Sequence, residues 1–265
     1  MKVRMITVGL VLLFLSSTSF ALIGPPTAEL DKGQWSIGYN YSYSTQDMDK
    51  ANYHGFDTGG ASSYGKFKIE DFKTQRHYAT LSYGVTDFWE IYGSIGIADV
   101  KEDEKQYYSS GSVGEFATNF DNDFAFGWGT RVTFLKGEKI SWGAALQMNI
   151  LDTSWDESGV DVGGAWKDTF ELEAYDLMFT VGPTVDMGNW KLYCGPLYYY
   201  FNGDYDYKST YTGGVSKESF TVKPDGNFGG FVGAQIPVAQ DLDLTAEASM
   251  VSGGYGLACG LEWKF

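Results

Sequence analysis

The chain has 265 residues, with 34 acidic and 19 basic side chains and a formal net charge of −15 at pH 7. This charge has the wrong sign for binding phosphate backbones and argues against a nucleic-acid partner. Aromatic residues make up 17% of the chain, which also holds 34 Gly but only 6 Pro, a composition typical of a tightly curved sheet with aromatic girdles rather than of an ordinary soluble domain.

The first 21 residues have the pattern of a secretory signal peptide. Lys2 and Arg4 precede an apolar run over residues 6–15, and residues 19–21 form a small-x-small site that suits cleavage after Ala21. The apolar run is shorter than the roughly 20 residues that a spanning helix needs. We therefore expect a signal peptide at residues 1–21 and one domain at residues 22–265. No later stretch is long and apolar enough for a transmembrane helix, and the mean hydropathy is −0.22.

Apolar and small or polar residues then alternate in about ten segments. Side chains of a strand point to opposite faces with period two, so each segment predicts a strand with one apolar face. A membrane barrel tolerates low mean hydropathy because only alternate residues face lipid, and we predict a transmembrane antiparallel up-and-down β-barrel of about ten strands. The predicted strands span residues 35–44, 76–83, 89–97, 126–134, 140–150, 175–185, 190–200, 228–236, 242–250 and 255–265.

The predicted connections fall into two length classes. Short turns at residues 85–87, 137–138, 187–189 and 238–241 alternate with long segments at 47–66, 101–122, 154–168 and 207–218. Short periplasmic turns and long extracellular loops are typical of outer-membrane barrels. A soluble barrel or sandwich, the alternative, also alternates in hydropathy but has no reason to segregate its loop lengths.

The last strand carries a specific resemblance. Leu261, Trp263 and Phe265 occupy alternate positions up to the final residue, and Cys259 precedes them. This ending resembles the C-terminal insertion signal of bacterial outer-membrane β-barrel proteins, and the resemblance covers residues 30–265. It implies an outer-membrane location, handover to the barrel-assembly machinery, and contact with outer-membrane lipid and lipopolysaccharide. Cys259 departs from the large apolar residue expected there, and no subfamily is indicated.

Charged residues on the polar face of the strands predict a network in the lumen. Unpaired buried charges cost several kcal/mol, so charges inside a narrow barrel must pair. We expect Arg131 and Glu247 to lie at similar heights, and likewise Glu262 and Lys264 near the base. The predicted network comprises Arg76, Arg131, Glu90, Asp176, Glu247, Glu262 and Lys264.

Ten strands lie nearer to the filled eight-stranded barrels than to the open porins of 16 to 18 strands. This size favours a structural or surface-interaction barrel whose lumen is largely filled. A narrow channel for small solutes or ions is the alternative, and the sequence leaves the oligomeric state open.

Acidic residues cluster in the segments 99–123 and 152–168. Carboxylates suit Ca²⁺ or Mg²⁺, but neither segment has the spacing of a calcium-binding loop, so we interpret them as solvated acidic loops. We expect no metal and no cofactor.

Residues suited to catalysis are few. The histidines are His54, in a long loop, and His77, on the apolar face of its strand. A hydrolase at the rim is a weaker alternative, because no catalytic motif matches, and we expect no catalytic residues and no enzyme. Cys194 and Cys259 face outward on non-adjacent strands, so no disulfide is expected.

Overall fold

The computed structural model describes residues 24–58, 62–107, 113–119, 123–161 and 164–265. The expected signal peptide, residues 1–21, lies outside these ranges. Among the residues so described, no helix is long and apolar enough to cross a membrane.

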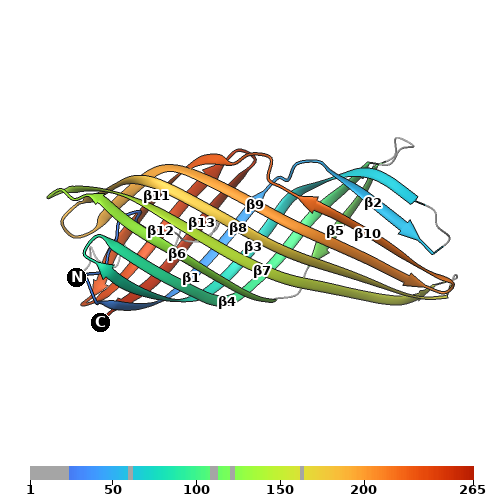
Figure 1. The fold of residues 1–265 in the computed structure, drawn as a ribbon, viewed down its shortest axis with the longest axis horizontal. Coiled ribbons are helices and arrows are strands. Elements are labelled where there is room, and N and C mark those ends of the chain that lie inside the picture. The colour runs from blue at the N-terminus through green and yellow to red at the C-terminus, as the bar shows by residue number, and fades with distance from the viewer. Residues whose placement is uncertain (1–23, 59–61, 108–112, 120–122, 162–163) are drawn as a thin grey trace, which may run out of the picture.

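The described chain is built almost entirely from antiparallel strands (Figure 1). In chain order these are β1 (Trp35–Gln46), β2 (Ala51–Asp57), β3 (Ser62–Thr86), β4 (Trp89–Tyr107), β5 (Val113–Asn119), β6 (Asp123–Leu135), β7 (Ile140–Asp161), β8 (Gly164–Asp186), β9 (Lys191–Tyr211), β10 (Gly214–Val222), β11 (Phe228–Ala239), β12 (Leu242–Val251) and β13 (Gly254–Lys264).

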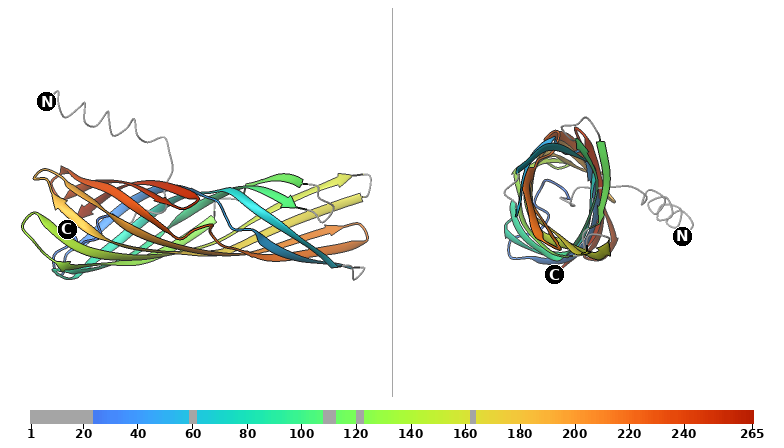
Figure 2. Two further views of the ribbon diagram at one scale, coloured as in Figure 1. Left: turned by 90° about the horizontal axis from the view of Figure 1, so that it is seen from above. Right: turned by 90° about the vertical axis from the view of Figure 1, so that its right-hand side faces the viewer.

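Ten of the strands close into a ring, which the end-on view of Figure 2 shows as a tube. Around the ring their order is β1, β3, β4, β6, β7, β8, β9, β11, β12 and β13. The ring closes where β13 pairs with β1, from Ser36↔Lys264 to Gln46↔Gly254. The predicted antiparallel barrel of about ten strands is confirmed.

The segments expected to be long loops are largely strands. β2, β5 and β10, with the outer ends of β3, β4, β7, β8 and β9, continue the barrel wall away from the short turns; we call this part the outer extension. The hydropathy alternation does not indicate these strands because the apolar residues change from one face of the strand to the other. On β8, Leu177 and Phe179 lie on the outer face, whereas Phe170 and Leu172 farther out face the interior.

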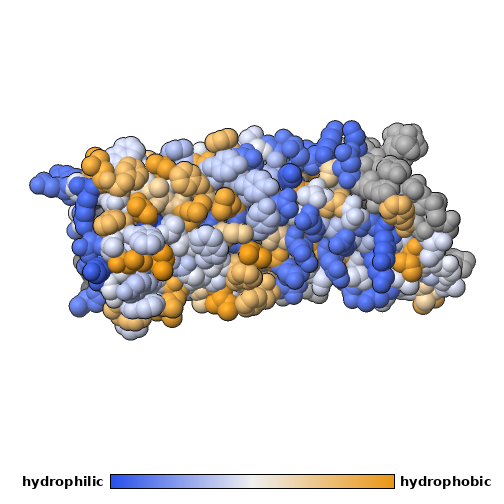
Figure 3. Space-filling model, viewed as in Figure 1, coloured by the Kyte–Doolittle hydropathy of each residue, from blue (hydrophilic) through white to orange (hydrophobic). Residues whose placement is uncertain are grey.

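The outside of the ring carries an apolar belt. Figure 3 shows apolar residues gathered over the half of the barrel that holds the short turns, whereas the outer extension is mostly hydrophilic. A soluble monomer rarely exposes an apolar surface of this extent. The belt includes Trp35, Ile37, Tyr39, Leu81, Trp89, Ile91, Ile95, Ile97, Phe126, Trp128, Trp142, Tyr175, Phe179, Leu261 and Trp263.

The interior changes character along the barrel. Within the belt it is polar and charged, with buried Arg76, Glu90 and Asp176. Farther out it becomes an apolar and aromatic core, in which Phe72 of β3 and Phe201 of β9 have ring centroids 5.2 Å apart. β3 and β9 are not neighbours in the ring, so these rings meet across the lumen.

Phe265 makes the last rung of the closing pair. Its carbonyl accepts from the N–H of Trp35 at 3.1 Å, and its N–H donates to the carbonyl of Trp35 at 2.9 Å. The Phe265 side chain is 60% exposed, with its ring 5.5 Å from that of Trp263. The terminal residue therefore joins the two ends of the ring and adds to the edge of the apolar belt.

We predict that Phe265→Asp lowers the amount of folded protein in the outer membrane, because a carboxylate at this position removes apolar contact with lipid at the closing seam. The heat-dependent gel shift of outer-membrane fractions measures this amount. Phe265→Leu, the control, keeps an apolar side chain and should stay near wild-type level. Equal levels of Phe265→Asp and Phe265→Leu would contradict the prediction.

Candidate functional site

Residues 24–31, which we call the plug, lie inside the barrel at the end with the short turns. In the end-on view of Figure 2 this stretch, coloured blue, runs within the ring. Thr27 and Leu30 are only 3% and 2% exposed. Two wall glycines make room for it: a Cβ on Gly84 would lie 2.1 Å from the carbonyl oxygen of Asp31, and one on Gly143 would lie 2.5 Å from that of Pro26. Any side chain at these wall positions would displace the plug.

Hydrogen bonds tie the plug to strands from both halves of the chain. The bonds are Gly24 N–H to Glu247 Oε2 at 3.0 Å, Ala28 N–H to Thr133 Oγ1 at 3.0 Å, Glu29 N–H to Glu90 Oε2 at 3.0 Å, and the hydroxyl pair of Thr27 and Thr184 at 2.8 Å. These partners lie on β12, β6, β4 and β8, so the plug is held from several sides.

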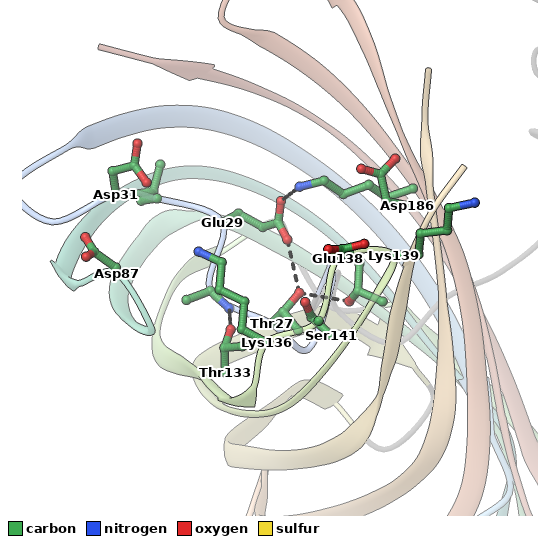
Figure 4. Close-up of a pocket in the computed structure, with 15 residues that line it drawn as sticks. Thr27, Glu29, Asp31, Asp87, Thr133, Lys136, Glu138, Lys139, Ser141 and Asp186 are labelled. Carbon is green, nitrogen blue, oxygen red and sulfur yellow. Dashed lines mark hydrogen bonds and ion pairs between the residues drawn. The ribbon is translucent and has the colours of Figure 1, made fainter. Parts of the chain in front are cut away.

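A polar pocket of about 280 Å³ opens beside the plug (Figure 4). The Glu29 carboxylate accepts from the Thr27 hydroxyl at 3.0 Å and forms an ion pair with Lys191 of β9. Neither Glu29 nor Lys191 belongs to the network predicted from the sequence. The lining from the wall includes Asp87, Thr133, Lys136, Glu138, Lys139, Ser141, Thr184, Asp186 and Lys191.

The first cluster of the lumen network centres on Arg131 of β6. Its Nη1 lies 2.6 Å from Glu90 Oε1 on the neighbouring strand β4, where Arg131 and Glu90 are directly paired. The guanidinium also lies 4.8 Å from the centre of the Tyr92 ring, within the range of a cation–π contact. Glu90 is 0% exposed, so its charge depends on this partner.

The second cluster spans the lumen. Arg76 Nη2 of β3 lies 2.5 Å from Asp176 Oδ2 of β8, on the far side of the ring. Asn149 donates to Asp176 Oδ1 at 2.7 Å and accepts from Gln147 at 3.1 Å. Gln147 in turn accepts from the Tyr92 hydroxyl at 3.0 Å. One polar chain therefore connects Arg76 to the Arg131 cluster.

Glu247 and Arg131, expected at similar heights, meet at the plug. Glu247 Oε2 accepts from Gly24 N–H and from the Tyr193 hydroxyl at 3.1 Å. A Cβ on Gly24 would lie 3.0 Å from Arg131 Nη2, so the guanidinium packs against the same glycine.

Glu262 and Lys264 are two positions apart on β13, and each makes its ion pair or hydrogen bond with a neighbouring strand. Lys264 Nζ lies 2.9 Å from Asp243 on β12, and Glu262 accepts from the Ser36 hydroxyl at 2.5 Å. Asp243 and Glu262 are directly paired across β12 and β13. Lys264 of β13 thus forms its ion pair with Asp243 on the neighbouring strand β12.

The sequence pattern does not indicate the plug or the uncharged side chains that connect the two clusters. The inward position of Tyr92 does have a signal in the sequence. Tyr92 lies on the polar face of its strand, opposite Gly129 on the next strand. A Cβ on Gly129 would lie 2.3 Å from the Tyr92 ring, so the glycine makes room for the inward tyrosine.

His77 lies on the outer face of the barrel, away from the lumen. His77 Nδ1 lies 2.6 Å from the Tyr39 hydroxyl on the outer face of the barrel, and the His54 side chain lies outside the described part. Cys194 and Cys259 are free thiols. In the portion of the chain that the structure describes, no group of three or more His, Cys, Asp or Glu residues is arranged to hold a metal ion.

We predict that Asp176→Ala destabilises the folded protein by about 3–5 kcal/mol, because it leaves the Arg76 guanidinium buried without its carboxylate. Urea unfolding in detergent micelles measures the loss. The double variant Arg76→Met, Asp176→Leu should recover most of it, and Asp152→Asn, an exposed carboxylate on the outer face of β7, should cost little. A loss for Asp176→Ala no larger than that for Asp152→Asn would contradict the prediction.

No family model matches the chain, and no curated protein matches its sequence. Among solved structures, the chain is similar to the outer membrane protease OmpT from Escherichia coli and to the outer membrane protein OprG from Pseudomonas aeruginosa, each at 12% identity and a TM-score of 0.48. These matches cover 87% and 89% of this chain and 97% of each of the two structures. Ail, the attachment invasion locus protein of Yersinia pestis, matches at 10% identity and a TM-score of 0.28 over 88% of this chain and 99% of its own.

The location follows from this chain's own closed ring, polar lumen and apolar belt, which together are the features of a barrel that crosses an outer membrane. The chain therefore folds as a small β-barrel of the outer-membrane type.

Proposed function

We propose that this protein is a closed barrel whose role is structural or surface-interacting and is carried by the outer extension. The observation that supports this most directly is the filling of the lumen by three successive layers. Each layer connects strands that are not neighbours in the ring, so none is merely a lining of the wall.

The layers differ in chemistry. The plug occupies the periplasmic mouth, and the ion pair between Arg76 and Asp176 crosses the middle of the lumen. The outer layer is aromatic, and there the Tyr205 hydroxyl of β9 donates to Glu102 of β4 at 2.7 Å. A solute crossing the barrel would have to break contacts in all three. A filled lumen is also what a ring of this size favours.

The outer extension supplies the surface that such a protein would use. Its hairpins project beyond the apolar belt and present exposed carboxylates on their outer faces. These carboxylates are Asp152, Glu171, Glu173, Asp204 and Asp206. Their position just beyond the belt supports contact with basic macromolecules at the cell surface.

A narrow channel is the second candidate. Three buried polar atoms of the lumen wall, Arg76 Nε, Tyr78 Oη and Thr180 Oγ1, have no hydrogen-bond partner. Such atoms could bind a permeating water or ion. An enzyme is disfavoured, because the ion pairs of the lumen are enclosed and His77 is bonded to Tyr39 on the lipid-facing side.

We predict that the wild-type protein gives no steady single-channel openings in planar bilayers, because three layers close it in series. Arg131→Ala should remain silent, since it leaves the Arg76 pair and the aromatic layer in place. A general porin reconstituted in the same way is the positive control. Steady openings of the wild type that change with Arg131→Ala would favour the channel and overturn the closed barrel.

We further propose that residues 1–21 are a signal peptide removed before the barrel closes. The positively charged start, the apolar run over residues 6–15 and the small-x-small site ending at Ala21 support this. The intact mass of protein purified from outer membranes should correspond to a chain that begins at Leu22. A mass that includes residues 1–21 would contradict the proposal.

A further inference from the structure

The ring of hydrogen bonds is complete across the belt but not in the outer extension. β6 pairs with β7 from Leu135↔Trp142 to Ala125↔Leu151. Beyond that point β7 continues to Asp161 and pairs with β8 alone, while β5 continues the line of β6 beside β4 (Figure 1). In the described ranges β5 and β7 do not pair. Among the described strands, none pairs with the outer half of β7 on the side away from β8, so we treat this side as a strand edge.

The direction of the free backbone groups can be assigned from one contact. The Ser154 N–H donates to the Asp123 carboxylate at 3.1 Å, so it points away from β8 and toward the open side. The Thr153 hydroxyl bonds the same carboxylate oxygen at 2.7 Å. In an antiparallel pair, successive residues direct their N–H and C=O groups to alternate sides. Asp156 and Ser158, in the same register as Ser154, thus present N–H and C=O groups on the open edge.

The side chains along this edge differ on its two faces. On the inner face Trp155 is half-buried, with its ring 5.2 Å from that of Phe170, which lies 4.5 Å from Tyr207. On the outer face Asp156 bonds Lys167 at 2.7 Å. Two hydrogen bonds hold the pKa of the Asp156 carboxyl below its usual value. The larger effect comes from Lys167 and the smaller from Thr169.

The outer face beside the edge is strongly acidic. Asp152 of β7 is directly paired with Glu173 of β8, and Glu171 lies opposite Ser154. Like charges directly opposite each other destabilise a sheet, so a cation placed beside them is favourable. The inner face, by contrast, offers aromatic surface for an apolar side chain.

We propose that the outer half of β7 binds an extended, cationic polypeptide segment of another protein by adding it as a strand. The segment's backbone would pair with the edge groups of Asp156 and Ser158. Its outward side chains would be Lys or Arg beside Asp152 and Asp156, and its inward side chains would be apolar and contact Trp155. Strand addition of this kind takes affinity from main-chain hydrogen bonds and specificity from alternate side chains.

Charge decides against a second copy of this chain as the occupant. Two β7 edges placed together would bring Asp152 and Asp156 of one copy against the carboxylates of the other, and such pairs repel. Charged residues on an edge also protect it from pairing with itself. The edge is therefore selective for a partner of opposite charge.

This inference rests on the proposed function, in that it takes the outer extension as the working surface. Different measurements would contradict the closed barrel and the strand edge. Steady conductance would overturn the closed barrel whatever the peptide result, and the peptide test below concerns the β7 edge alone.

The test measures binding of a short fluorescent peptide that alternates lysine with valine to the full protein in detergent micelles, by fluorescence anisotropy. We expect saturable binding. The same peptide N-methylated at alternate residues should bind at least about tenfold more weakly, because it cannot complete the edge hydrogen bonds. A version with glutamate in place of lysine should not bind. Equal binding of the N-methylated peptide would show attraction to the acidic face alone and would overturn the proposal.

A proline tests the position of the edge. The Ser158 N–H faces the open side, so Ser158→Pro removes a donor there without removing a bond to β8, and proline is tolerated at such positions. We expect Ser158→Pro to weaken peptide binding about tenfold and Ser158→Ala to change it less than about twofold. The heat-dependent gel shift verifies that both variants fold.

Two further outcomes would overturn the proposal. One is unchanged peptide binding by a folded Ser158→Pro variant. The other is self-association of the wild-type protein in sedimentation measurements that Ser158→Pro abolishes, since this would identify a second copy as the occupant of the edge.

Discussion

Inside the hydrocarbon layer no backbone N–H or C=O can remain without a partner, because there is no water to replace one. A sheet in that layer must therefore close on itself, and here it closes through the pairing of β1 with β13 down to the rung between Trp35 and Phe265. The same requirement ends where the belt ends. In the outer extension water can satisfy backbone groups, so β7 can continue for ten residues beyond its last pair with β6 while pairing, among the described strands, with β8 alone.

Closing a ring of ten strands creates a second constraint, because the lumen is narrow and its charges are removed from water. Arg76 and Arg131 each lie against a carboxylate, and amide and hydroxyl groups connect the two pairs. Separating the two partners of a buried ion pair leaves each charge without compensation, which is costly. Such a network therefore holds its members in a single arrangement. The plug takes part in this arrangement through Glu90 and Glu247 rather than resting against the wall.

The strands that cross the apolar belt were predictable, because positions that face lipid favour apolar side chains. The end of the chain, Leu261 to Phe265, carried the same pattern. The outer strands were harder to predict, since on β8 the apolar residues change from the outer to the inner face between Phe179 and Leu172. Parity assigns seven charged residues to the lumen face, and five of them, Arg76, Arg131, Glu90, Asp176 and Glu247, are buried. The partners of these charges were not predictable from parity, because the tilt of the strands decides which residues lie at the same height in the lumen. Lys264 contacts Asp243 on the neighbouring strand, and Arg76 contacts Asp176 across the ring. The plug has no periodicity, so no hydropathy pattern could identify it.

The contacts of the plug join the two ends of the sequence. Gly24 bonds Glu247, 223 residues away, and Thr27 meets Thr184, 157 residues away. Contacts between positions so far apart form slowly, because the loop between them must be ordered first. The plug cannot reach its position until β12 has joined the wall. The first segment of the barrel to be synthesised is therefore among the last to reach its final contacts, and a kinetic study of refolding should find the burial of the plug in a late phase, after the strands have formed.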